Sequence, residues 1–333
     1  MNVKYFTVLS ITIVFLILSS GCITPTYTSC GDGVCDADKE KYNTCPKDCS
    51  ETTNITLEGK NVTILDFPES FFVDGNIEPE RMAYILDLYY DIIANAFGKT
   101  DALHRIYIKY SNENCGSYSN SHDFTVTICK SFTPNGRHNW AVYAHEISHN
   151  IAGQSPLFLY LAEHGYSAYL DEHQAEIMPE YVFWNIKNNQ TAYGITNSEL
   201  EQMRLSNEEN RRIQQNSYSE YVANGKQFYI LQDDVEKATK TGHATSHIIF
   251  KLVDNDQSPQ RIKFFVRALN DDWLKQAGFD KKTPTDEELA NYVIAAHSAA
   301  KDGDDLRSTF RDELNYPVND TLYQKYYQLL AIK

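Results

Sequence analysis

Residues 141–153 read AVYAHEISHNIAG, and this stretch determines the fold and the chemistry that the rest of the sequence must fit. It contains the pattern HExxH, with His145 and His149 four residues apart. Residues at this spacing lie on one face of a helix, so both imidazoles can reach a single metal ion. Glu146, between them, is the residue type that activates water at such an ion. The stretch therefore predicts a helix that supplies two metal ligands and a general base.

The residues around the motif are apolar, which predicts that most of this helix is buried. Polar groups are costly to place in apolar surroundings unless they have partners or a function. This favours a metal site over the alternative, a helix whose His and Glu side chains make only surface hydrogen bonds. The helix is predicted to end at Gly153, and its flanking apolar residues are Trp140, Val142, Tyr143, Ile147 and Ile151.

A catalytic zinc ion keeps three protein ligands and one open position, so a third ligand is required. The next segment, PLFLYLAEHGYSAYL at residues 156–170, is predicted to be helical, and Glu163 is its best candidate. His164 is a rival ligand, while Glu172 and His173 are more remote alternatives.

This order of motif and helix resembles the gluzincin metallopeptidases, in which HExxH precedes a helix of the approximate pattern WLxEGxAxY. The resemblance covers residues 104–270 and implies zinc-dependent peptide hydrolysis, with Glu146 activating the zinc-bound water. The sequence departs from the family where His164 follows Glu163, where only thirteen residues separate Glu163 from the motif, and where the tryptophan is missing. The implied metal ligands are His145, His149 and Glu163.

A peptidase also needs a hydrogen-bond donor for the oxyanion that forms on the scissile carbonyl. The predicted helix at 241–254 carries His243 and His247, again four residues apart. It resembles the downstream family helix that supplies this donor, so His243 would take the place of the family's tyrosine. Surface or capping histidines and a second metal site are the alternatives.

Gluzincin substrates bind by adding a strand to a sheet edge beside the active helix. Strands are predicted at 104–110 and 124–130, and the segment Cys115-Gly116-Ser117-Tyr118 would lie at that edge. Gly116 would allow a close approach of the substrate backbone. Cys115 and Cys129 are predicted to close the intervening loop with a disulfide.

The remaining sequence is mostly helical in its periodicity. A strand at 61–67 precedes an amphipathic helix at 78–97. We therefore predict an α+β fold for residues 61–333, a gluzincin-like domain with a small mixed sheet packed on a largely helical body. Its other helices are predicted at 139–152, 157–172, 198–214, 241–254, 259–269, 286–301 and near Tyr323.

The N-terminus has the pattern of a signal for export. Lys4 precedes an apolar run at 5–18, which is shorter than the roughly 20 residues that span a bilayer. The sequence LSSGC at 18–22 resembles a lipobox, in which Cys22 becomes the lipidated first residue. We expect a signal peptide at 1–21 and a protein anchored to the cell membrane by lipid, facing outside.

Residues 30–49, CGDGVCDADKEKYNTCPKDC, have almost no apolar side chains, so only cross-links or metal could hold their shape. They resemble small CGDGxC...CPxDC modules of surface proteins. Two disulfides are favoured over a four-thiolate zinc site outside the cell. A polar linker at 50–60 follows, giving an anchored cysteine-rich stalk at 22–60. An alternative Ca²⁺ site would use Asp32, Asp36, Asp38 and Asp48.

The formal net charge of −15 argues against a nucleic-acid partner, which would require clustered lysine and arginine. The expected partners are a peptide or protein substrate and, through Cys22, the membrane. Two other functions fit the same sequence. One is a catalytically silent surface protein with a metallopeptidase fold, used for binding or envelope structure; the other is a zinc hydrolase acting on a different amide. The intact Glu146 favours an enzyme over the first of these.

Overall fold

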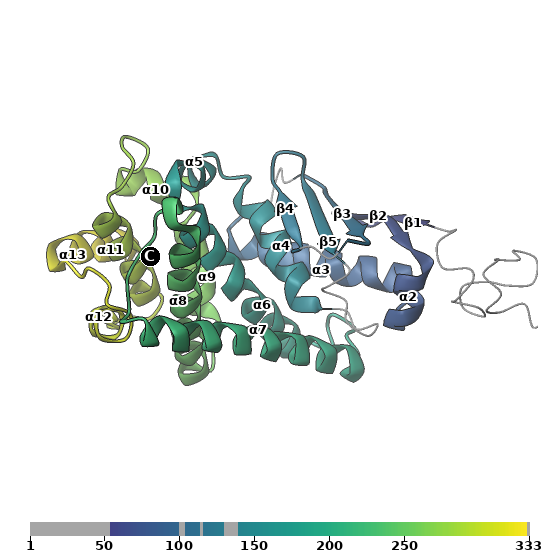
Figure 1. Ribbon diagram of the computed structural model, residues 1–333. Coiled ribbons are helices and arrows are strands. Elements are labelled where there is room, and N and C mark those ends of the chain that lie inside the picture. Colours follow the sequence, from purple (N-terminus) through teal and green to yellow (C-terminus); the bar gives the residue numbers. More distant parts are fainter. Residues whose placement is uncertain (1–53, 100–103, 114–115, 130–138, 332–333) are drawn as a thin grey trace, which may run out of the picture. The chain divides into compact units, whose positions relative to one another are not determined.

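The computed structural model describes residues 54–333 except 100–103, 114–115, 130–138 and 332–333 (Figure 1). The predicted signal peptide, Cys22, and the cysteine-rich module with its alternative calcium site all lie outside the described residues. Within the described part of the chain, no helix has the length and apolar character needed to cross a membrane.

A five-stranded mixed sheet forms one side of the unit that comprises residues 54–333 (Figure 1). Its order is β1-β2-β3-β5-β4, with the inner pairs parallel and the two outer pairs antiparallel. Strand β4 is therefore an edge strand. The strands are β1 (Asn54–Glu58), β2 (Val62–Pro68), β3 (Ile106–Ser111), β4 (Tyr118–Asn120) and β5 (Thr125–Cys129).

Three of these strands confirm the predictions at 61–67, 104–110 and 124–130 to within two residues. Strand β1 is a correction, because it lies inside the predicted linker at 50–60 and pairs with β2. Its sequence NITLE alternates polar and apolar residues, and Ile55 and Leu57 pack partly buried against the core. Five alternating residues between polar neighbours give only a weak signal for a strand.

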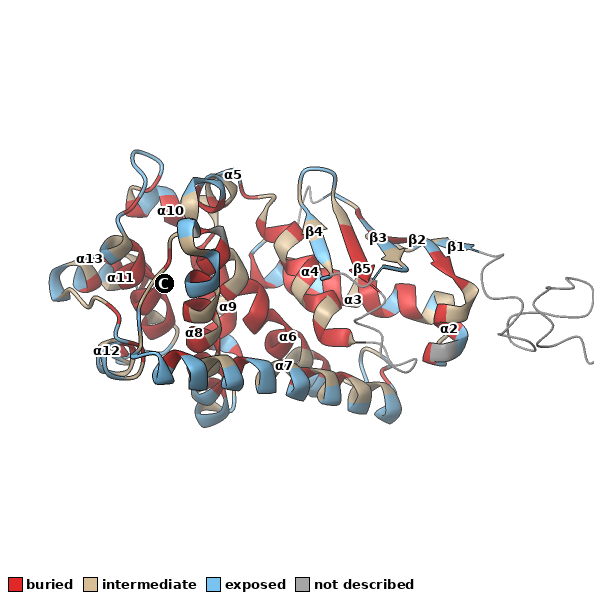
Figure 2. Ribbon diagram, in the orientation of Figure 1, coloured by how far each residue is buried: buried red, intermediate tan, exposed pale blue. Residues whose placement is uncertain are grey.

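Helices make up most of the rest of the described chain, which is α+β as predicted. Helix α4 contacts β4 and β5 on one side and α6 on the other, so the HExxH helix lies between the sheet and the helical body. Helix α7 runs along the outside, where much of its surface is exposed, while α4 and α6 are mostly buried (Figure 2). The helices are α2 (Glu69–Gly75), α3 (Pro79–Ala96), α4 (Trp140–Ala152), α5 (Pro156–Leu161), α6 (Glu172–Asn188), α7 (Asn197–Ala223), α8 (Val235–Asp256), α9 (Gln260–Ala268), α10 (Asp271–Ala277), α11 (Asp286–Ala299), α12 (Arg307–Leu314) and α13 (Asp320–Ala331), with short helical segments η3 (Ala162–Asp171) and η4 (Gln232–Asp234).

The segment predicted as one helix at 157–172 is broken in the structure. Non-helical backbone occurs at His164 and Gly165, and the φ angle of Gly165 is +116°. Residues with a Cβ atom rarely adopt this conformation, so a glycine is suited to the position. The chain changes direction there and a new helix, α6, begins at Glu172. Sequence analysis missed α6, which contains Pro179, a residue that argues against a helix interior.

A buried ionic network fixes α6 against α7. Glu180 has 1% of its side chain exposed and receives two hydrogen bonds from Arg211 at 2.7 and 2.5 Å. Trp184 and Asn207 donate to the same carboxylate, each at 2.6 Å. Buried charges are tolerated when they are paired and fully hydrogen-bonded. This network holds α7 at a fixed distance from the residues at the start of α6.

Candidate metal centre

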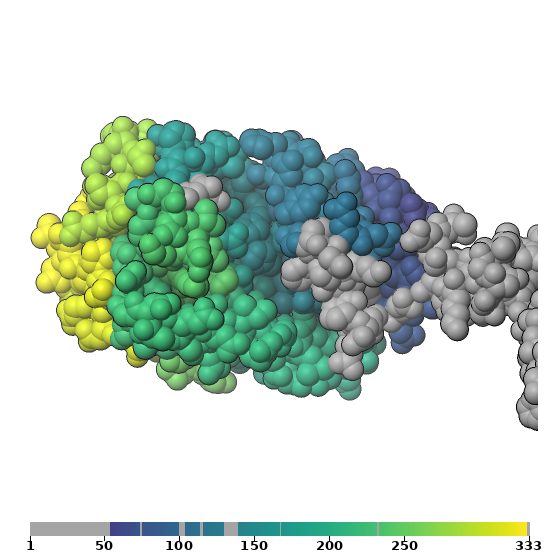
Figure 3. All heavy atoms as spheres, in the orientation of Figure 1, coloured from purple at the N-terminus to yellow at the C-terminus, as the bar shows by residue number. Residues whose placement is uncertain are grey.

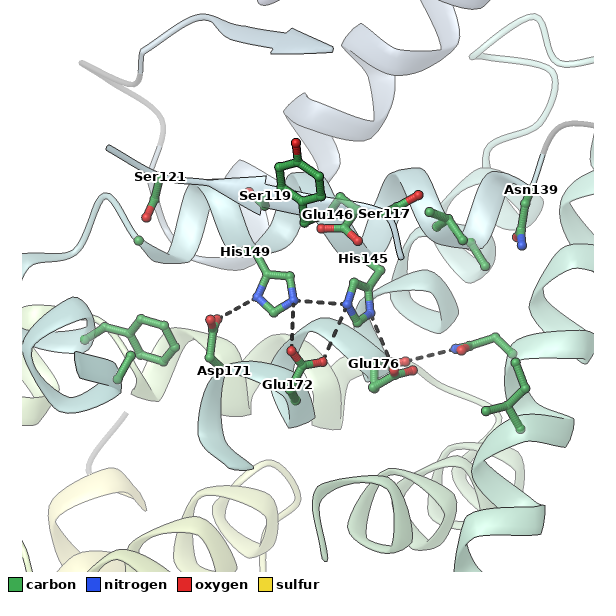
Figure 4. A pocket seen from close by; sticks show the side chains of 18 of the residues that line it. Ser117, Ser119, Ser121, Asn139, His145, Glu146, His149, Asp171, Glu172 and Glu176 are labelled. Carbon is green, nitrogen blue, oxygen red and sulfur yellow. Dashed lines mark hydrogen bonds and ion pairs between the residues drawn. The ribbon is translucent and has the colours of Figure 1, made fainter. Parts of the chain in front are cut away.

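Helix α4 brings the two histidines of the motif together as predicted. The Nε2 atoms of His145 and His149 are 3.0 Å apart (Figure 4). Both rings are largely buried, with 18% and 12% of their side chains exposed. The pair comes entirely from local geometry, because a four-residue separation is about one helical turn.

The start of α6 supplies the carboxylates around this pair. An oxygen of Glu172 is 3.7 Å from Nε2 of His145 and another is 3.8 Å from Nε2 of His149. Of the described side chains, only Glu172 forms ion pairs with both imidazoles. Asp171 lies 2.8 Å from Nδ1 of His149, and Glu176 lies 3.6 Å from Nδ1 of His145 (Figure 4).

This arrangement leaves the two Nε2 atoms in need of a cation. A carboxylate opposite each Nδ1 favours the tautomer with its proton on Nδ1, which leaves a lone pair on Nε2. The two Nε2 atoms, 3.0 Å apart beside the negative charge of Glu172, can then share a proton or bind a metal ion. His145, Glu146 and His149 are close enough to hold a metal ion, and so are His145, Glu172 and Glu176. The donor set of imidazole and carboxylate fits a divalent cation.

Shifts in pKa follow from the same crowding of charge. Burial raises the pKa of Glu146, against the lowering effect of the two imidazoles. Burial alone would lower the pKa of His149, but Asp171 and its carboxylate neighbours raise it to about 10. For Glu176, burial acts upward, yet His145 and His243 bring the net pKa below its ordinary value. The protonated form of His149 is therefore stabilised by several carboxylates.

Glu163, the predicted third ligand, is placed elsewhere by the structure. Its side chain is 53% exposed, and its carboxylate lies 3.6 Å from His122 on the hairpin between β4 and β5. His164 is also exposed, with its Nδ1 2.8 Å from the carbonyl oxygen of Tyr160. Glu163 precedes the break at Gly165, whereas the helix after the break brings Glu172 to the two histidines.

Of the two more remote alternatives, the structure brings only Glu172 to the motif. His173, the next residue, is fully buried and contacts Ser246 and His297 instead. The signal that could have identified the correct segment is the pair Glu172 and Glu176, which repeats the four-residue spacing of the histidines on the next helix.

His243, the predicted oxyanion donor, lies behind Glu176. Its Nε2 is 3.4 Å from the Glu176 carboxylate, and its Nδ1 is 3.1 Å from the hydroxyl of Ser217. It is not among the residues that line the cavity beside the motif. The structure therefore places His243 where it supports Glu176, and not where it reaches a substrate carbonyl. His247 stacks on Tyr218 with ring centroids 4.8 Å apart.

A cavity of about 480 Å³ opens beside the two histidines. Glu146 lines it with only 5% of its surface exposed, and no hydrogen bond or ion pair joins it to another described side chain. In the space-filling view the surface is recessed between the blue strand region and the green helices (Figure 3). The other walls come from β4 and the residues around it (Ser117, Tyr118, Ser119, Ser121), from α5 (Phe158, Leu159) and from α7 (Glu209, Asn210, Ile213).

The predicted substrate edge is beside this cavity. Ser117 and Tyr118 line the cavity, and the space where a side chain at Gly116 would begin is open for 4 Å. Cys129 is disulfide-bonded, as the predicted bridge requires at that end, while Cys115 lies outside the described residues. Asn150 ties α4 to this hairpin through the hydroxyl of Ser119 at 2.6 Å and the carbonyl of Thr125 at 2.9 Å.

No protein-family model, no curated protein and no solved structure matches this chain.

Proposed function

We propose that this chain is a zinc-dependent metallopeptidase of the gluzincin type, with His145, His149 and Glu172 as metal ligands. The observation that carries the proposal is the convergence of two Nε2 atoms and one carboxylate, at separations of 3.0 to 3.8 Å. With zinc–ligand distances of about 2.0–2.1 Å in a tetrahedron, the ligand atoms lie roughly 3.3 Å apart. The two Nε2 atoms are close to that separation, and each of the two Glu172 oxygens lies 3.7 or 3.8 Å from one of them. Glu172 replaces Glu163 in the proposed ligand set.

Asp171 and Glu176 complete this proposed site by orienting the ligands. Metal-binding histidines commonly donate their second ring N–H to a carboxylate, which fixes the ring and increases its basicity. Asp171, 2.8 Å from Nδ1 of His149, would accept this hydrogen, and Glu176 lies 3.6 Å from Nδ1 of His145. In turn, Gln214 donates to the carboxylate of Glu176, and His243 lies against it.

Zinc, when bound, would polarise the scissile carbonyl and acidify a water molecule. Glu146 would take the proton of that water and pass it to the leaving amine, a role that suits a carboxylate whose pKa is raised by burial. The edge of β4 would hold the substrate backbone as an added strand. The expected signal peptide and lipid anchor would place this activity outside the cell membrane.

Metal content tests the ligand assignment directly. Purified wild-type protein should carry one zinc ion per chain, and a chelator should stop its digestion of casein. Glu172→Ala should lose the metal, while Glu163→Ala, the matched control, should keep both metal and activity. If zinc remains in Glu172→Ala and is lost from Glu163→Ala, the assignment is wrong.

Glu146→Gln tests the general base. The substitution keeps the size of the side chain, so zinc content should not change, while the turnover number should fall about 10²–10⁴-fold. Activity within a fewfold of wild type would remove Glu146 from the mechanism.

A further inference from the structure

Along its described lining, the cavity beside the motif has more carboxylates than basic side chains. Its described lining includes five carboxylates and neither lysine nor arginine. A divalent ion at the proposed site would offset only part of this charge. Carboxylates lining a recessed, partly desolvated surface concentrate ligands of the opposite sign. The carboxylates are those of Glu146, Asp171, Glu172, Glu176 and Glu209.

Glu209 differs from the other four because it lies across the cavity on α7, away from the histidines. Among the described residues, its only ionic partner is Arg212, one turn along the same helix, at 2.5 and 2.8 Å. Both side chains of this pair are more than half exposed. Exposed pairs of this kind contribute little to stability, so a cation from a ligand can replace Arg212 at low cost.

Apolar surface next to Glu209 suits the stem of a long basic side chain. Ile213, one turn further along α7, is 44% exposed and lines the same cavity, and Val142 faces the cavity from α4. Lysine and arginine pack their methylene stems on apolar surface while the charged end reaches a polar partner. Glu146 is buried in this lining and has no hydrogen-bond or ion-pair partner among the described side chains, which also indicates that the cavity receives a ligand from outside the chain.

We infer that the cavity selects peptides with a cationic nitrogen close to the scissile bond, with Glu209 as a specificity-determining residue. The inference rests on the proposed function and names its substrate class. The nitrogen can belong to a lysine or arginine side chain or to the peptide's amino terminus. Substrates held by a terminal carboxylate are disfavoured, because the five carboxylates of the described lining outnumber its two histidines.

A pair of peptides that differ at one position tests this on the full-length, zinc-loaded protein. One peptide carries arginine next to the scissile bond and the other carries glutamine, and each is prepared with a free and with an acetylated amino terminus. We expect kcat/KM to be about fivefold higher or more for a cationic peptide, and the preference to shrink as salt is added. A preference for arginine that survives acetylation identifies the side chain as the source. A preference lost on acetylation identifies the terminal amine.

Matched variants on α7 assign the effect to its residue. Glu209→Gln should lower the ratio of kcat/KM between cationic and neutral peptides severalfold. Glu208→Gln removes a neighbouring carboxylate that pairs with Arg204 and does not line the cavity, so its ratio should equal that of wild type. Equal ratios in wild type and Glu209→Gln, or no preference at all, would overturn the inference.

Failure of the inference is distinguishable from failure of the proposed function. Cleavage of the neutral peptide without a charge preference leaves the peptidase standing and removes the specificity. If neither peptide is cleaved, the peptidase proposal fails, and fluorescence anisotropy with the same peptides on zinc-loaded Glu146→Gln still measures the preference. Equal affinity for arginine and glutamine peptides in that measurement also overturns the inference.

Discussion

Two pairs of histidines lie on or beside α6, and they have nearly the same Nε2–Nε2 distance but opposite surroundings. His145 and His149 have Nε2 atoms 3.0 Å apart, and those of His173 and His297 are 3.2 Å apart. The first pair has carboxylates at both outer nitrogens and lines a cavity. The second pair is fully buried, and the ring of His297 stacks on Phe265 at 4.2 Å.

The proton positions explain why the second pair needs no cation. Ser246 donates its hydroxyl hydrogen to the carbonyl of Gly242 at 3.0 Å, so His173 Nδ1 donates to Ser246 at 2.9 Å. His173 Nε2 then accepts the hydrogen of His297 Nε2, which leaves His297 Nδ1 buried with a lone pair and without a partner. Two neutral rings thus share one N–H···N bond.

The difference teaches that the distance between imidazoles does not define a metal site. Burial lowers the pKa of His173 to about 3, while carboxylates raise that of His149 to about 10 despite its burial. The anions and the cavity, and not the histidine spacing, make the α4 pair a candidate for a divalent ion. Four measurements would break or sharpen this contrast.

The largest expected effect is on metal binding at the α4 pair. His149→Ala should remove zinc from the purified protein and lower peptide hydrolysis by at least about 10³-fold, because a ligand and its charge balance are lost. His164→Ala, an exposed histidine in the neighbouring segment, is the control and should keep both. Zinc retained in His149→Ala would erase the contrast between the two pairs.

The next effect concerns stability at the core pair. His297→Ala opens a cavity and leaves Nε2 of His173 without its donor, so the free energy of unfolding should fall by about 3 kcal/mol. Denaturant titration measures this change, and zinc content should stay at the wild-type level. Loss of zinc together with stability would mean that the core pair, too, supports the metal.

A smaller effect is expected from the carboxylate that orients His149. Asp171→Asn keeps the shape of the side chain but removes its charge, and zinc affinity should fall about 10–100-fold. Competition with a chromophoric chelator measures the dissociation constant. The control is Asp312→Asn, because Asp312 is exposed. Asp271 is not used as a control, because it accepts hydrogen bonds from Ser155 and from the backbone of Leu157. An unchanged dissociation constant would exclude Asp171 from the site.

The smallest effect is the response of the core pair to acid. Since the pKa of His173 falls from 6.5 to about 3 on folding, the unfolded chain binds more protons between these values. The contribution of His173 to the free energy of unfolding is complete above pH 6.5. It declines as pH falls, by about 1 kcal/mol between pH 6.5 and 5.5. Denaturant titrations of wild type and the double variant His173→Leu/His297→Leu measure it. Equal slopes against pH would show that the core pair does not contribute.

The parts of the site that sequence could predict are those set by local geometry. His145, Glu146 and His149 share one helix, so their relative positions follow from its periodicity. The long amphipathic helix α3 and the three central strands follow from apolar spacing in the same way. These elements need no knowledge of the rest of the chain.

The third ligand could not be chosen in this way, because it depends on a change of direction at Gly165. Glu163 is closer to the motif in sequence, but it lies before the break. The helix that packs against α4 is α6, which follows the break. His243 was predicted as an oxyanion donor, and its contact with Glu176 could not be predicted for a related reason: it joins two helices that are far apart in sequence. Only the packing of α6 against α8 determines which carboxylate His243 contacts.

The break at Gly165 also has an evolutionary consequence. Each residue added to or removed from a helix turns everything beyond it by about 100°. A single insertion between Gly165 and Asp171 would therefore rotate Glu172 and Glu176 away from α4 together, while an insertion in the turn between α6 and α7 would not. Among descendants of this sequence, length should be constant across 165–176 and free to vary after Asn188.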